Sequence, residues 1–86
     1  IETAYTILNG EYEVIEADII ETSELINKSL KDSGLPEEIR IGAILRDGKI
    51  IIPRSDFIFQ KDDTVVFLAK KETISLVENL FRISSI

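Results

Sequence analysis

The chain has 86 residues, of which 44% are hydrophobic and 30% charged, and its formal net charge is −6 at pH 7. It contains no cysteine and no histidine, so disulfides, thiolate chemistry and the commonest general base are excluded. We therefore expect no enzyme, no catalytic residue and no metal site. An acidic chain without a long apolar run is also not expected to bind nucleic acid or to insert into a membrane.

The length predicts one domain, residues 1–86, and the absence of an initial Met suggests a piece of a longer protein. The first 24 residues hold seven acidic residues and no Lys or Arg, which is typical of a solvated strand face. These acids are Glu2, Glu11, Glu13, Glu16, Asp18, Glu21 and Glu24.

A β-hairpin is predicted first. Residues 5–8 and 12–20 flank Asn9-Gly10, a strong signal for a two-residue turn. Apolar and acidic residues alternate along the second segment, as in a half-buried strand. Whether residues 1–8 form the partner strand or a linker from an upstream domain is left open.

A short helix is predicted next, between Ser23 as its N-cap and Gly34 as its C-cap. Its apolar stripe consists of Leu25, Ile26 and Leu30. Pro36 then prevents the helix from continuing.

The second hairpin is the most informative segment. Residues 39–46 and 49–52 flank Asp47-Gly48, and a two-residue turn fixes the register of the two strands. The predicted pairs are Arg46 with Lys49, Leu45 with Ile50, Ile44 with Ile51, and Ala43 with Ile52.

Both faces of this hairpin are apolar. Strict alternation places Ile41, Ala43, Leu45, Ile50 and Ile52 on one face, which we expect the helices of the domain to cover. Ile44 and Ile51 then remain as an exposed pair on the other face. An exposed apolar patch is typical of an interface, so Ile44 and Ile51 are predicted to form the contact of a homodimer.

The chain then runs through residues 57–59 and a polar turn into one further strand, 64–69, and a helix over roughly residues 71–82 completes it. The predicted order is β-α-β-β-β-α. This order describes a small two-layer α+β sandwich, a mostly antiparallel sheet with two helices.

Several of these segments together resemble the TrkA C-terminal domain, also called the RCK C-terminal domain. They are Asn-Gly-Glu-Tyr-Glu-Val-Ile-Glu-Ala-Asp at 9–18, Leu-Pro-Glu-Glu-Ile-Arg-Ile-Gly-Ala-Ile-Leu-Arg-Asp-Gly-Lys-Ile-Ile-Ile-Pro-Arg at 35–54, 59–67, and Val-Glu-Asn-Leu-Phe-Arg at 77–82. The usual Gly-Asp of the family before the last strand stands here as Asp62-Asp63. Asp tolerates a left-handed turn better than most residues, so the same turn is expected.

The resemblance implies a regulatory role. TrkA-like proteins are peripheral cytoplasmic subunits that form rings beneath a potassium-translocating membrane subunit at the inner face of the plasma membrane. Their Rossmann-like domains bind NAD(H) or ATP, and their C-terminal domains dimerise. This chain lacks the Gly-x-Gly-x-x-Gly fingerprint, so no cofactor is expected in it. The alternative is a ligand-sensing module of the same fold inside another cation antiporter or permease.

The resemblance also implies a candidate ligand site, because some relatives bind cyclic di-AMP at the dimer interface of this domain. The matching positions are Ile44, Arg46, Ile52, Pro53 and Arg54, which would supply an apolar floor and phosphate partners. The competing and favoured interpretation is that Arg46 and Arg54 are solvated residues at the hairpin edge.

Two weaker hypotheses concern the remaining polar residues. Asp56, Asp62 and Asp63 could hold a divalent cation, but turn chemistry explains them better. Tyr5 and Tyr12 could stack on a base, although packing within the sheet is the simpler interpretation.

Overall fold

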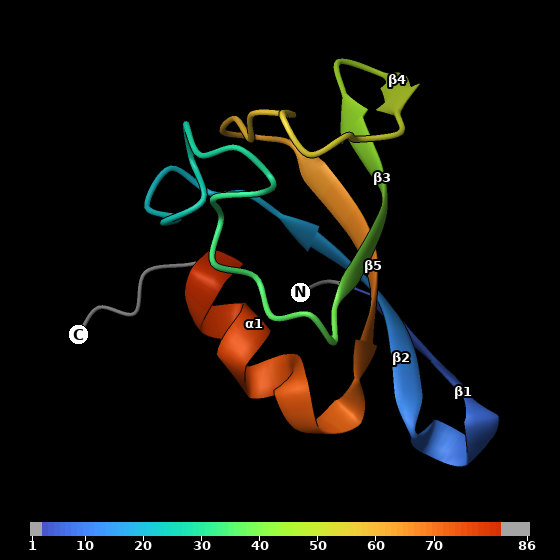
Figure 1. Cartoon of the computed structure of the whole chain (residues 1–86). Helices are drawn as coiled ribbons and strands as arrows, with labels where there is room; N and C mark the ends of the chain where they lie inside the picture. Colours follow the sequence, from blue (N-terminus) through green and yellow to red (C-terminus); the bar gives the residue numbers. More distant parts are fainter. Residues whose placement is uncertain (1–2, 82–86) are drawn as a thin grey trace.

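The computed structural model describes residues 3–81 and contains one antiparallel sheet of five strands with a helix on one face (Figure 1). The strands are β1 (Thr3–Ile7), β2 (Tyr12–Asp18), β3 (Arg40–Arg46), β4 (Lys49–Ile51) and β5 (Thr64–Lys70). Their order across the sheet is β1-β2-β5-β3-β4, so β5, the last in sequence, lies at the centre. A 3₁₀ turn (Lys71–Thr73) leads into α1 (Ile74–Phe81).

Both predicted hairpins are confirmed. Arg46 pairs with Lys49 across a two-residue turn, and Ile7 pairs with Tyr12 across residues 8–11, which include a 3₁₀ turn (Leu8–Gly10). The turn residues Asn9 and Asp47 have φ angles of 57° and 52°, and the glycine after each is also left-handed. The question about residues 1–8 is settled for residues 3–7, which form a strand.

The predicted helix between Ser23 and Gly34 is wrong. This segment forms turns closed by i to i−3 hydrogen bonds, and its backbone also bonds the segment before β5. The N–H groups of Asn27 and Leu30 donate to the carbonyl oxygens of Phe59 and Phe57, at 2.9 and 2.8 Å. These long-range bonds replace the i to i−4 bonds that a helix would make.

Residues 57–59 form no strand, and Ile58 makes an isolated bridge to Ser29. The α+β class and the antiparallel sheet are therefore confirmed. The second predicted helix exists in the form of α1, but the order β-α-β-β-β-α is not observed.

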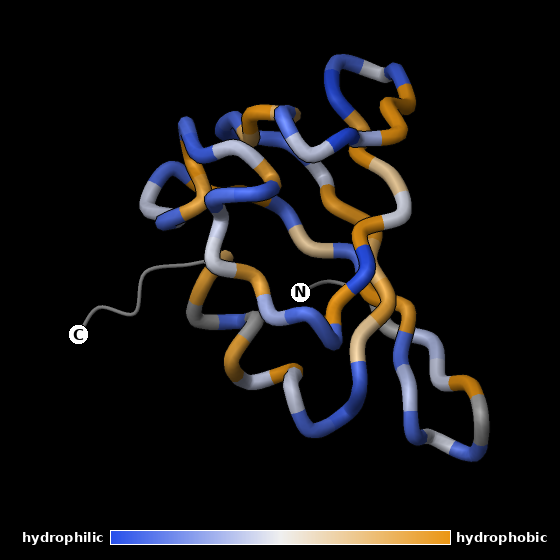
Figure 2. Tube along the Cα trace, in the orientation of Figure 1, coloured by the Kyte–Doolittle hydropathy of each residue, from blue (hydrophilic) through white to orange (hydrophobic). Residues whose placement is uncertain are grey.

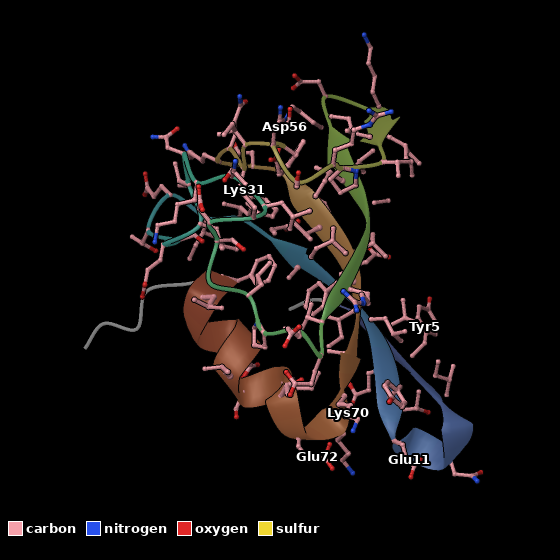
Figure 3. All side chains as sticks on the ribbon, in the orientation of Figure 1. Tyr5, Glu11, Lys31, Asp56, Lys70 and Glu72 are labelled. Atoms are coloured by element: carbon pink, nitrogen blue, oxygen red, sulfur yellow. The ribbon has the colours of Figure 1, made fainter. Side chains whose placement is uncertain are left out.

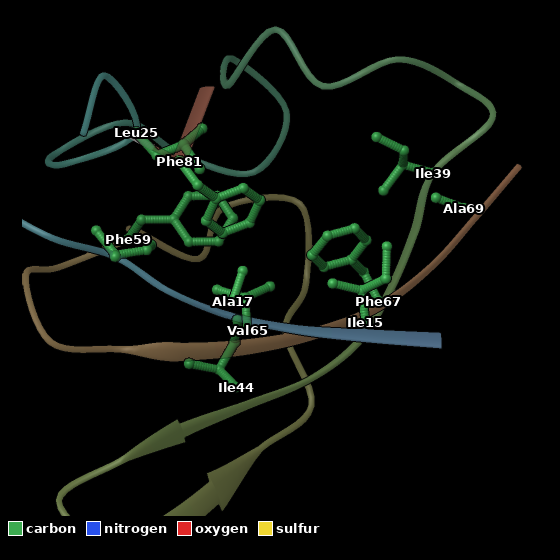
Figure 4. Packing of buried hydrophobic residues seen from close by; sticks show 11 residues of the cluster. Ile15, Ala17, Leu25, Ile39, Ile44, Phe59, Val65, Phe67, Ala69 and Phe81 are labelled. Atoms are coloured by element: carbon green, nitrogen blue, oxygen red, sulfur yellow. The ribbon is translucent and has the colours of Figure 1, made fainter. Parts of the chain in front are cut away.

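The core lies between the sheet and α1 together with the loop of residues 19–39 (Figure 4). Its fully buried side chains include Ile15, Phe59, Val65 and Phe67. Phe67 of β5 stacks on Phe81 of α1 with ring centroids 5.3 Å apart, which fixes the helix to the sheet.

A β-bulge reverses the predicted faces of the second hairpin. Ile41 pairs with Phe67 on the core side, but Ala43 pairs with Val66. β3 therefore carries one extra residue, Gly42, relative to β5. Beyond the bulge Ile44, not Ala43, points into the core and is fully buried. Ile44 therefore cannot be the exposed residue that alternation predicted, and Ile51 is half-buried against the core cluster.

Asp62 adopts a φ angle of 72° in the turn that precedes β5, as the comparison with the family's Gly-Asp implies. We predict that Asp62→Val loses about 1–2 kcal/mol of unfolding free energy, because this conformation is costly for residues other than Gly, Asn and Asp. Asp62→Gly should be at least as stable as the wild type. Urea denaturation measures both, with the exposed Lys61→Val as the control. Equal stability of Asp62→Val and Lys61→Val would contradict the prediction.

Candidate functional site

The tip of the β3–β4 hairpin is fixed to the rest of the domain by one ion pair. Arg46, the last residue of β3, donates from Nε and Nη2 to the two carboxylate oxygens of Asp63, each at 2.7 Å. Asp63 is 1% exposed, so this bidentate pair is shielded from water on the carboxylate side. The Asp63 side chain also accepts the Gln60 N–H at 2.8 Å.

Arg46 makes two further contacts with the loop before β5. Nη2 donates to the Ile58 carbonyl oxygen at 2.9 Å, and the guanidinium lies 4.9 Å from the centre of the Phe57 ring. The hydrogen bond with Asp63 is the main reason that the pKa of Arg46 lies above its ordinary value. The Arg46 guanidinium therefore has a structural role, holding the end of β3 against the loop before β5.

The five predicted ligand residues do not form one site. Ile44 is buried in the core, and Arg46 is engaged by Asp63. Ile52 and Arg54 are exposed and Pro53 is half-buried, all in the segment that follows β4. The sequence pattern thus identified a surface segment but included two residues with structural roles.

The exposed face of the hairpin is apolar. Leu45 and Ile50 are directly opposite each other and are 42% and 71% exposed, and the nearby Ile52 is 72% exposed. We call these three residues the hairpin patch. Figure 2 shows the corresponding hydrophobic colouring along β4 at the far end of the sheet from the β1–β2 turn. The predicted exposed apolar face therefore exists, but on the side opposite to the predicted one.

The other candidates have ordinary structural roles. Asp63 pairs with Arg46, and Asp62 is exposed. Asp56 is exposed as well (Figure 3). No group of three acidic side chains suited to a metal ion occurs within residues 3–81. Tyr12 is paired with Ile7 and Tyr5 with Val14, as sheet packing requires.

One cavity of about 320 Å³ lies between the loop of residues 30–37 and the start of β3. Its walls are mainly apolar, and Arg40 and Glu37 are its charged residues. None of the predicted ligand residues lines it. In the part of the chain that the structure describes, no helix is long and apolar enough to cross a membrane.

These features describe a small antiparallel-sheet domain with an exposed apolar hairpin. The family model of the TrkA-C domain matches residues 14–82, and the chain belongs to this family. The TrkA-C domain is a regulatory, non-enzymatic domain.

Several curated proteins are similar to the chain. Trk system potassium uptake protein TrkA of Azorhizobium caulinodans is 39% identical over 84 residues, which cover 98% of this chain and 18% of that protein. A TrkA homolog of Archaeoglobus fulgidus is 33% identical over 88% of this chain and 17% of its own length. The chain thus spans less than a fifth of these relatives.

Solved structures show the same fold. An RCK_C domain dimer of S. agalactiae BusR in complex with c-di-AMP superposes with a TM-score of 0.69 at 22% identity, covering 79% of this chain and 93% of that one. An RCK domain with cda gives a TM-score of 0.67 at 18% identity, over 80% and 97% of the two chains.

The ion pair gives a stability prediction. We expect Arg46→Met to lose about 3 kcal/mol of unfolding free energy, because it leaves the Asp63 carboxylate buried without its partner. Arg54→Met, which changes charge identically at an exposed position, should stay within about 0.5 kcal/mol of the wild type. Replacing both partners, as Arg46→Met with Asp63→Leu, should recover part of the loss. Denaturant titration tests all three, and equal stability of the two single variants would refute the role of Arg46.

Proposed function

We propose that this chain is the dimerising regulatory domain of a peripheral cytoplasmic subunit that gates a potassium-uptake transporter. The membership in the TrkA-C family and the names of its relatives support the potassium system. Their partner in this proposal is a potassium-translocating membrane subunit, and nucleotide binding belongs to other domains of the full-length protein.

One observation supports dimerisation above all, which is the hairpin patch. Ile50 and Ile52 are more than two-thirds exposed although they are large aliphatic residues. Burying such a side chain is worth roughly 1.5–3 kcal/mol, so contact between two copies of the patch is favourable. A two-fold contact between identical patches is the commonest arrangement that buries such a surface.

In this proposal the dimer transmits the regulatory signal by ordinary linkage. A ligand that binds one arrangement of the two copies more tightly shifts the population of the whole ring toward it. The rigid connection from the hairpin to the core through Arg46 and Asp63 supports this role, since a movement of the patch must displace the β5 turn as well.

The dimer is tested with Ile50→Glu. The change removes an apolar contact from both copies and places like charges at the interface, so we expect dimerisation weaker by at least about 100-fold. Analytical ultracentrifugation measures this, and circular dichroism checks the fold. The control is Leu76→Glu, which places the same charge at a 51% exposed aliphatic position of α1. A wild type that is monomeric at on the order of 100 μM, or equal dimerisation of both variants, would overturn the proposal.

A second proposal concerns a ligand of this dimer, a cyclic dinucleotide such as cyclic di-AMP. It is supported by the exposed segment Ile52–Arg54, which adjoins the hairpin patch, and by the absence of any ion-pair partner for Arg54 within residues 3–81. Arg54 is then the residue that pairs with phosphate, and Arg46 is not.

We expect cyclic di-AMP to bind the wild type and to bind Arg54→Ala about 10- to 100-fold more weakly, since a hydrogen bond to a charged group is worth about 1.5–3 kcal/mol. Isothermal titration measures the affinities. Arg40→Ala, which removes an exposed arginine from the other end of β3, serves as the control. Absence of binding, or equal affinities of the two variants, would eliminate Arg54 as a ligand residue.

A further inference from the structure

The two edges of the sheet are protected to different degrees. β4 has only three residues, begins with Lys49 and is followed by Pro53, and all three features discourage the addition of another strand. β1 has five residues, Thr-Ala-Tyr-Thr-Ile, without a charge or a proline. Its register with β2 runs without a bulge from Thr3 to Ile7, so the edge is regular throughout.

The outer edge of β1 has no pairing partner among the strands that the structure describes. Alternate N–H and C=O groups of an edge strand point outward and form a template for another strand. The side chains are also accessible, because Tyr5 is 64% and Ile7 is 42% exposed. Figure 3 shows Tyr5 on the side of the sheet away from α1, where no helix covers it.

We propose that β1 pairs antiparallel with β1 of a second copy of this chain, so that two five-stranded sheets join into one. The sequence is suited to a two-fold axis at Tyr5. Tyr5 then meets its own counterpart, and Thr6 and Ile7 of one copy meet Ala4 and Thr3 of the other. No like charges oppose each other in this register, and an aromatic cross-strand pair is favourable.

This contact goes beyond the hairpin dimer and does not depend on it. In the strand order β1-β2-β5-β3-β4 the two surfaces occupy opposite edges of the sheet, so they do not compete. A chain with two independent two-fold contacts can build assemblies larger than a dimer. The family match covers residues 14–82, so β1 lies outside that match.

The charges near β1 give the contact a distinct response to salt. Glu11 and Glu16 are exposed next to the edge strand, and the first 24 residues contain no basic residue. Two joined copies place their β2 strands about 14 Å apart, three strand spacings. This distance is within the Debye length of about 30 Å at 0.01 M salt but beyond that of about 8 Å at 0.15 M. The β1 contact should therefore strengthen as salt is raised over this range.

Hydrogen–deuterium exchange of the wild-type chain tests the proposal. As the protein concentration increases, the backbone amides of residues 3–7 should become protected, and more so at 0.15 M than at 0.01 M salt. Peptides that contain residues 49–52 report the hairpin dimer separately, so failure of one contact is distinguishable from failure of the other. Exchange of residues 3–7 that is independent of concentration would overturn the proposal.

A matched pair of variants provides the second test. Tyr5→Lys places two lysines opposite each other at the two-fold axis, which should weaken the concentration-dependent protection of residues 3–7 at least about tenfold. Ser75→Lys adds the same charge at an exposed position of α1 and should leave the protection unchanged. Equal protection in the two folded variants would likewise reject the β1 contact. If Tyr5→Lys fails to fold, the concentration dependence of exchange in the wild type alone decides whether the β1 contact forms.

Discussion

The placement of the hairpin depends on the bidentate pair between Arg46 and Asp63. Asp63 lies in the turn before β5, and its backbone is tied to the end of β2, because its carbonyl oxygen accepts the N–H of Ile19 at 2.8 Å. The Asp62 N–H donates in turn to the Ile19 carbonyl oxygen, also at 2.8 Å. One short turn thus connects the end of β2, the start of β5 and the end of β3. A buried carboxylate without a partner is costly, so the pair also selects the loop conformation that brings the guanidinium to it.

Local chemistry was sufficient to predict the turns and the strands beside them. Asn9-Gly10 and Asp47-Gly48 occupy left-handed turn positions, and few other residue pairs do so without strain. The segment after Ser23 shows the limit of this reasoning. Its capping and periodicity favour a helix, but the hydrogen bonds to Phe57 and Phe59 come from a segment about 30 residues away and outweigh that local preference.

The candidate site was predicted only in part, because its key contact is also made between residues far apart in the sequence. An arginine at a hairpin end has the same local sequence whether it is solvated or paired, and its partner Asp63 is 17 residues away. The second aspartate of the Asp-Asp turn was the available signal, since a buried acid before a central strand needs a cation. The reversed hairpin faces had a signal as well, because a glycine inside a strand often marks a bulge.

The bulge at Gly42 lets one strand contribute both to the core and to the exposed face of the hairpin. On its N-terminal side, β3 follows one alternation of inward and outward residues, and on its C-terminal side it follows the opposite one. The core is therefore completed by Ile41 and Ile44, while Leu45, Ile50 and Ile52 remain outside it. The outward residues of the hairpin can change in size or polarity without altering the packing of the core. A hairpin of this kind is a suitable position at which to engineer new pairing specificity into the domain.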